Sequence, residues 1–311
     1  MSLSFATAYD CYGYMPRASA NLAALVLFCI AWAAHTGLFI FFRQYWFGAC
    51  MFITCGLETA GYVGRYLSTS VYNVLNDYLV QIICLTLGPA FFMAGIYYLL
   101  GQCVIIWGVQ FSRFKPWTYS RIFIFGDLVS IVLQGAGGGM AATAVQNNQS
   151  TTSGTNIMIG GLAVQVVTTA VFAMVCLDYV LRLRRAQNAA MSASEPQYIP
   201  GAEQSDVQYD MMRGPAEYEH IRQSKKTYYF LFMIVLSVVF VYVRSVYRVV
   251  ELAAGWSGYL MNEEGYFLVL DTLMVFLATW ITWTCYPAFF IGNMKDDDSI
   301  DLVPQESPVE K

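Results

Sequence analysis

Long, mainly apolar stretches alternate with short polar segments along most of the chain. Each stretch exceeds the roughly 20 apolar residues that a transmembrane helix needs. They lie at residues 18–42, 45–67, 78–102, 121–145, 157–181, 228–253 and 266–291. The third contains Gly88-Pro89 in a long uncharged run, which predicts one long, kinked helix. The pattern predicts an all-α, polytopic membrane protein with seven transmembrane helices in one membrane domain, residues 18–291.

The positions of Lys and Arg predict the orientation, because basic residues in short loops are retained on the cytoplasmic side. With the N-terminus outside, 13 of the 17 basic residues fall in cytoplasmic segments, and the external segments hold only Arg17. The other three, Arg65, Arg244 and Arg248, lie inside predicted helices. Asn148 begins an Asn-Gln-Ser glycosylation pattern in a predicted outer loop. We therefore expect the N-terminus outside and the C-terminus in the cytoplasm.

Three segments outside the helices complete the predicted organisation. Residues 1–17 form an external N-terminal segment, whose Tyr12 and Tyr14 are expected to anchor at the membrane interface. A long cytoplasmic loop at about 182–227 has basic ends, expected to lie against anionic headgroups, and a polar middle, expected to be disordered. The acidic cytoplasmic tail, 292–311, is expected to be disordered as well.

Composition excludes several classes of protein. The chain is 57% apolar and 12% charged, whereas soluble domains are about 45–50% apolar and 25% charged. A net charge of −4 with scattered basic residues gives no electrostatic footprint for nucleic acid. Walker-type nucleotide motifs are absent, and two histidines in different compartments, His35 and His220, cannot form a metal centre. We expect no enzyme activity, catalytic residue, metal or cofactor, and we expect His35 to be a packed or hydrogen-bonded helix residue.

Ionisable side chains inside the predicted helices are the candidates for function, because each costs about 2.5–3.5 kcal/mol at bilayer depth and normally faces protein or water. Six lie in the second, sixth and seventh helices: Glu58, Arg65, Arg244, Arg248, Glu251 and Asp271. Spacings of three, four and seven place those of one helix on one face. Three acids and three bases predict a neutral, cross-paired cluster towards the outer side. It either fastens the helices together or lines a polar pocket, and the number of buried charges favours the pocket.

Two further features lie in the third to fifth helices. A second polar group comprises Gln81, Asp127, Gln134 and Gln165. With the first group it either lines a path across the membrane, which we favour, or makes unrelated interhelical hydrogen bonds. A glycine-rich run in the fourth helix predicts either close helix contact through Gly135 and Gly139 or a locally unwound segment.

Several short motifs occur in a fixed order along the chain. They are Tyr14-x-Pro16, Glu58-x-x-Gly61-Tyr62-x-x-Arg65, Gly88-Pro89-Ala90, Asp127 with Gln134-Gly135-x-Gly137-Gly138, Arg244-x-x-Tyr247-Arg248-x-x-Glu251, and Glu264 with Asp271. In these motifs the chain resembles, over about residues 9–291, the fungal lipid-translocating exporter family. These are seven-span proteins linked to 7-aminocholesterol resistance and to export of sphingoid long-chain bases. The family usually closes its last span with His-Pro-Gly, where this chain has Tyr286-Pro287-Ala288.

The resemblance implies export of amphipathic membrane lipids, such as sphingoid bases or sterol-like amines, or resistance to them, at the plasma membrane. A carboxylate-lined groove would suit a lipid with an ammonium head and a long tail. Glu58, Glu251 and Asp271 are the candidates for the amine. The buried arginines would hold these acids ionised or meet a phosphate. The alternative is a seven-helix lipid-sensing receptor that signals through the 182–227 loop.

Overall fold

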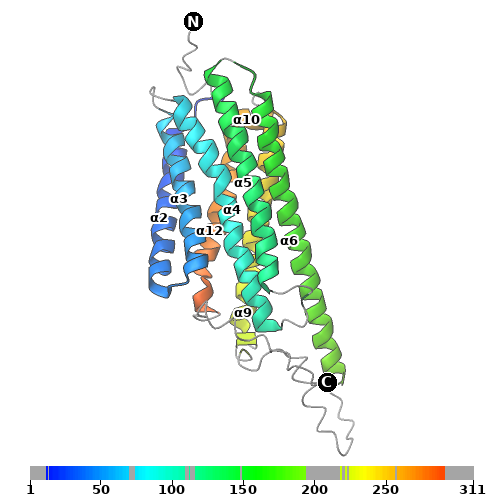
Figure 1. Ribbon diagram of the computed structural model, residues 1–311. Coiled ribbons are helices and arrows are strands. Elements are labelled where there is room, and N and C mark those ends of the chain that lie inside the picture. Colours follow the sequence, from blue (N-terminus) through cyan, green and yellow to red (C-terminus); the bar gives the residue numbers. More distant parts are fainter. Residues whose placement is uncertain are drawn as a thin grey trace, which may run out of the picture.

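The computed structural model describes residues 12, 14–69, 74–108, 112, 116–147, 149–193, 218, 221, 222, 224–255 and 258–290. Every regular element of four or more residues within these ranges is helical, and the helices form one elongated bundle (Figure 1). Six long helices come first: α2 (Ala18–Phe42), α3 (Tyr45–Leu67), α4 (Val74–Trp107), α5 (Pro116–Gln146), α6 (Thr152–Ala193) and α9 (Lys225–Ala253). The short α10 (Tyr259–Asn262) precedes a segmented last helix: α11 (Glu264–Phe267), η3 (Leu268–Leu273), α12 (Met274–Thr284) and η4 (Pro287–Phe289). The all-helical prediction is confirmed.

Six segments of the described chain are long and apolar enough to cross a membrane. They are Ala18–Phe42, Asn76–Trp107, Ser120–Ala144, Thr152–Ala186, Lys225–Ala253 and Glu264–Phe289. The 23-residue α3 is less apolar, because it contains Glu58 and Arg65, yet it packs between α2 and α4 (Figure 1). The count of seven spans therefore stays a prediction.

Helix ends agree with the sequence where a hydrophobic run ends at a turn. The structure begins and ends α2 and α3 at the predicted residues. It extends α6 to Ala193, so the first part of the predicted 182–227 loop is helical instead. Hydropathy marks where a helix leaves the bilayer, whereas an Asp178–Arg182 ion pair of 3.0 Å, four residues apart, helps the helix to continue. The remainder of the loop, the tail 292–311 and Asn148 fall largely or wholly outside the described residues.

Helix α4 is the central helix of the bundle. Its most apolar window is 61% buried, against 33% or less in the other five membrane-length segments. It packs against α3, α5, α6 and α9. Because Pro89 lies inside this helix and has no amide hydrogen, the carbonyl of Leu85 loses its helical partner near the middle of the bundle.

The glycine-rich part of α5 remains helical, so the unwound alternative is wrong. Its close contact is made by Gly137, where an added Cβ would lie 2.6 Å from the carbonyl oxygen of Gly154 in α6. An added Cβ at Gly135 or Gly139 would meet nothing within 4 Å. The predicted pair, Gly135 and Gly139, is therefore wrong, because these residues lie on a different face of the helix from the one that meets α6.

One buried histidine fastens the first helix to the last. His35 is fully buried, and its Nε2 lies 3.0 Å from the carbonyl oxygen of Thr279. It is the hydrogen-bonded helix residue that the sequence predicts.

Candidate functional site

Four charged side chains meet between α9 and the last helix. We call Arg244, Arg248, Glu251 and Asp271 the α9 charge cluster. Asp271 Oδ1 lies 2.9 Å from Nε of Arg244 and 3.6 Å from Nε of Arg248. Arg248 Nη1 lies 2.6 Å from Oε2 of Glu251, and the Tyr247 hydroxyl donates to the other carboxylate oxygen, Oε1. All four side chains are at most 4% exposed, and their formal charges sum to zero.

The backbone presents Asp271 in a widened turn. Residues Leu268–Leu273 form a π-helix between α11 and α12. Such widened turns insert one extra residue into a helix and occur frequently at functional sites. Here the turn contains Asp271, which bonds to two arginines on neighbouring turns of α9.

Arg244 also completes the interrupted helix α4. Its Nη2 donates a hydrogen bond to the carbonyl oxygen of Leu85, the acceptor that Pro89 leaves without an amide. A cation on α9 thus supplies a partner that α4 lacks, while its Nε remains paired with Asp271. This arrangement couples the proline break to the α9 charge cluster.

Glu58 lies against this same part of α4. Its side chain is buried, and a Cβ added to Gly88 would lie 2.6 Å from its Oε1. A glycine at position 88 is therefore what lets the carboxyl group approach the backbone. Among the described residues Oε1 has no hydrogen-bond partner, and no ion pair joins Glu58 to any of them.

Arg65 belongs to a second group, nearer the end of α3. Its Nε donates to Oδ1 of Asn21 at 2.7 Å, and its Nη2 donates to the hydroxyl of Tyr14 at 2.6 Å. Glu264 is its acidic partner, at 3.5 Å. Burial raises the pKa of the Tyr14 phenol above its ordinary value, so this hydroxyl stays protonated. The predicted single cluster is thus two groups, one around Arg65 and one around Asp271.

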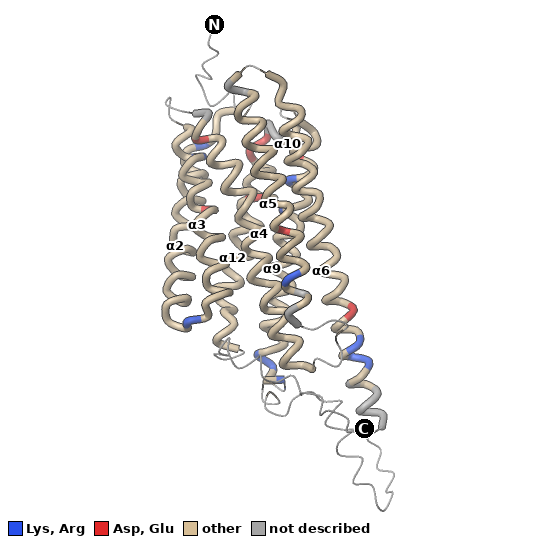
Figure 2. Tube along the Cα trace, in the orientation of Figure 1, with Lys and Arg blue, Asp and Glu red and all other residues tan. Residues whose placement is uncertain are grey.

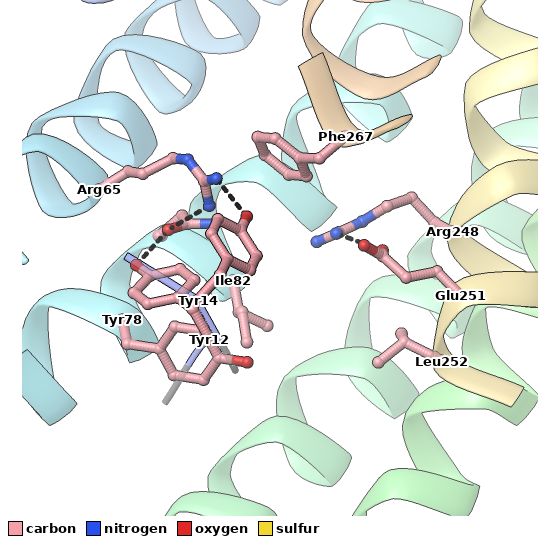
Figure 3. A pocket seen from close by; sticks show the side chains of 10 residues that line it. Tyr12, Tyr14, Arg65, Tyr78, Ile82, Arg248, Glu251, Leu252 and Phe267 are labelled. Atoms are coloured by element: carbon pink, nitrogen blue, oxygen red, sulfur yellow. Dashed lines mark hydrogen bonds and ion pairs between the residues drawn. The ribbon is translucent and has the colours of Figure 1, made fainter. Parts of the chain in front are cut away.

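A recess lies between these two groups (Figure 3). We call it the aromatic recess; its cavity volume is about 20 Å³, room for about one water molecule, and it is lined by Tyr12, Tyr14, Arg65, Tyr78, Gln81, Ile82, Arg248, Glu251, Leu252 and Phe267. Figure 3 shows Phe267 between the two arginines, whose guanidinium carbons lie 4.1 Å (Arg65) and 5.9 Å (Arg248) from the ring centroid. The aromatic faces of the recess therefore already lie against cationic side chains, and Glu251 is the carboxylate that lines it.

The second polar group is divided among three places. Tyr97 donates to Oδ2 of Asp127 at 2.9 Å. Gln134 of α5 donates to Gln165 of α6 at 3.1 Å, and it borders a smaller recess of about 10 Å³. Gln81 instead accepts from Tyr12 at 2.5 Å and lines the aromatic recess. Ile82 borders both recesses, but a continuous path stays a prediction.

Sequence reasoning missed the aromatic and N-terminal part of this recess. Tyr12 and Tyr14 were predicted to anchor at the membrane interface, whereas Tyr12 is buried and packs edge-on against Tyr78 at 4.7 Å. Phe267 gave no signal, because an aromatic residue at the start of a membrane helix is common. Glu264 lies outside the predicted hydrophobic span, so its pairing with Arg65 depends on how the chain folds back.

Comparison with known proteins places the chain in a family. The family model described as "RTA1 like protein" matches residues 51–294. The sphingoid long-chain base transporter RSB1 of Saccharomyces cerevisiae is 34% identical over 297 residues, which cover 94% of this chain and 76% of the yeast protein. The chain belongs to the RTA1-like family and is an integral, multi-pass membrane protein, and the resemblance seen in its motifs is confirmed.

Other yeast relatives carry different names. Protein RTM1 of Saccharomyces cerevisiae is 29% identical over 233 residues, covering 73% of this chain and 63% of the relative. Protoporphyrin uptake protein 1 of the same species is 27% identical over 250 residues, covering 79% of this chain and 69% of the relative. No solved structure matches the chain.

Proposed function

We propose that the protein transports amphipathic lipids with a cationic head, such as sphingoid long-chain bases. The observation that carries this proposal is the aromatic recess, whose lining includes Glu251, three tyrosines and Phe267. Similarity to a protein named as a sphingoid long-chain base transporter supports the same substrate class. We place the protein in the plasma membrane and assign it no enzyme activity.

The recess is proposed to open towards the outer side, with seven spans and the N-terminus outside. Basic residues of the described chain concentrate at the opposite end of the bundle, where α2 ends and α9 begins, and along the projecting part of α6 (Figure 2). Retention of basic residues in the cytoplasm would place that end inside. The end of α3 that contains Arg65 would then face the exterior.

The ion pairs of the α9 charge cluster suggest how an ammonium head is accepted. Glu251 is held by Arg248 at 2.6 Å, and an incoming ammonium would take over this carboxylate. Arg248 would then be retained by Asp271, which is already 3.6 Å away. Asp271 then faces both arginines, so the bound ammonium leaves the cluster with one surplus positive charge, while the lipid tail stays in the apolar surroundings.

Transport is tested with purified, full-length protein in liposomes containing a fluorescent long-chain base. Wild type is expected to accelerate base movement between leaflets, and Glu251→Gln to lose at least about tenfold of that rate, the equivalent of one charge-assisted hydrogen bond. Asp178→Asn is the matched control, because Asp178 belongs to an ion pair whose two side chains are 40% and 42% exposed. Unchanged base movement in Glu251→Gln would remove the recess from the mechanism.

A lipid-sensing receptor is the competing class of function. The named relatives include a transporter and an uptake protein, so the comparisons do not favour the receptor. The same liposomes distinguish the two classes. Binding of the base without movement between leaflets would support the receptor and refute transport.

A further inference from the structure

Glu58 is a buried carboxyl group without a cation of its own. Arg244 and Arg248 are matched by Asp271 and Glu251, so the α9 charge cluster is already neutral. Glu58 is 1% exposed, and an ionised third carboxylate would leave an uncompensated negative charge at bilayer depth. Buried groups in this position take up a proton instead of remaining charged.

The cations near Glu58 in the described part of the chain are already paired with other carboxylates. Charges of Arg244 and Arg248 on α9, and of Asp271 in η3, act on it. Cys84 of α4 also lies within its electrostatic reach, as do Cys55 and Tyr62 of its own helix. On α2, His35 bonds to Thr279 and Cys29 is exposed, and the α12 sequence contains no ionisable side chain.

Arg244 is the cation that could reach Glu58 after a change of partners. It is engaged by Asp271 and by the Leu85 carbonyl. Both arginines approach the same oxygen, Oδ1 of Asp271, at 2.9 and 3.6 Å. When Arg248 moves closer to this oxygen, the ion pair between Arg244 and Asp271 weakens, and Arg244 becomes available to pair with Glu58.

We propose that Glu58 is a proton-exchange site that couples lipid-base movement to a proton. The proposal rests on the transport function proposed above. An ammonium head pairs with Glu251, and Arg248 changes its partner from Glu251 to Asp271. Arg244 then changes its partner from Asp271 to Glu58, and the O–H bond of the Glu58 carboxyl breaks. The proton is released to water, so one positive charge enters the buried region and one leaves it. The buried region stays neutral throughout.

The proton on Glu58 is tested without any transport measurement. Infrared spectra of the full-length protein are expected to contain the carbonyl stretch of a protonated carboxylic acid. That band should be lost in Glu58→Gln and persist in Asp127→Asn, which alters another buried carboxyl, bonded to Tyr97. Addition of sphingosine should reduce the band in wild type. A band unaffected by Glu58→Gln would overturn the proposal. Glu58→Asp keeps a titratable group and serves as a second variant should the amide disturb folding.

Coupling is tested in liposomes with N-trimethylated sphingosine, whose permanent charge prevents it from following a pH gradient as a free amine. With the wild-type protein, a gradient of one pH unit should drive about tenfold accumulation of this lipid on one side of the membrane. This is the limit for exchange of one lipid for one proton. Glu58→Gln should lose the gradient-driven accumulation, because a glutamine side chain has no proton to exchange. Wild-type movement that is indifferent to the gradient would overturn the coupling alone. Absence of wild-type movement would overturn the transport function, and the infrared band would still decide whether Glu58 holds a proton.

Discussion

Arg244 of α9 donates a hydrogen bond to the main-chain carbonyl of Leu85, four residues before Pro89 in α4. The same guanidinium pairs with Asp271 at 2.9 Å. One side chain therefore links the interruption of the central helix to the widened turn of the last helix. Loss of this side chain affects both places at once.

Removing one partner of this buried pair should be costly, and removing both should be tolerated. Arg244→Met leaves Asp271 and Glu251 to share Arg248, so the cluster carries one surplus negative charge, and the variant is expected to destabilise the protein by about 3–5 kcal/mol. The double variant Arg244→Met with Asp271→Leu should recover the part of that loss that comes from the unpaired charge, because apolar packing replaces a buried ion pair well, while the Leu85 carbonyl still lacks its donor. Thermal unfolding in detergent measures both. Equal destabilisation of the single and double variants would contradict the pairing.

The contact between α5 and α6 predicts opposite behaviour for two glycines of one helix. Gly137→Ala would push a methyl group to within 2.6 Å of backbone atoms of Gly154 and Met158, so the helices must separate, at a cost of about 1–3 kcal/mol. Gly139→Ala meets open space and should be neutral or stabilise the helix by up to about 1 kcal/mol. Unfolding temperatures compare the two. Similar melting of both variants would show that this contact does not hold the helices together.

The proposed orientation predicts labelling at only one end of α6 in intact cells. Ser153 and Arg184 are both exposed and lie on one helix, about 46 Å apart along its axis. Cys11 lies in the predicted external segment 1–17 and is replaced to remove its thiol. A membrane-impermeant maleimide should then label Ser153→Cys at once and Arg184→Cys only after permeabilisation. The reverse order would invert the orientation and place the aromatic recess on the cytoplasmic side.

Sequence patterns predicted the helices well because long apolar runs are a one-dimensional signal. They also indicated which helices carry buried charges, since such residues must face protein or water. The residues with which these charged side chains pair were harder to predict from the sequence. Glu264 binds Arg65 only because the chain brings the start of the last helix next to Asn21, and the hydrogen bond from Arg244 reaches a backbone carbonyl, which no pattern of side chains reveals. The π turn at Leu268–Leu273 was hidden for the same reason.

Helix α6 is 42 residues long, about 63 Å, and projects beyond the neighbouring helices (Figure 1). Its outer part is continuous with the part that packs on α5, so whatever is joined to its end must follow the orientation of the bundle. A small membrane protein that is mostly hidden in a detergent micelle offers little for particle alignment in electron microscopy. A helical scaffold fused in phase after Ala193 would supply a rigid marker outside the micelle.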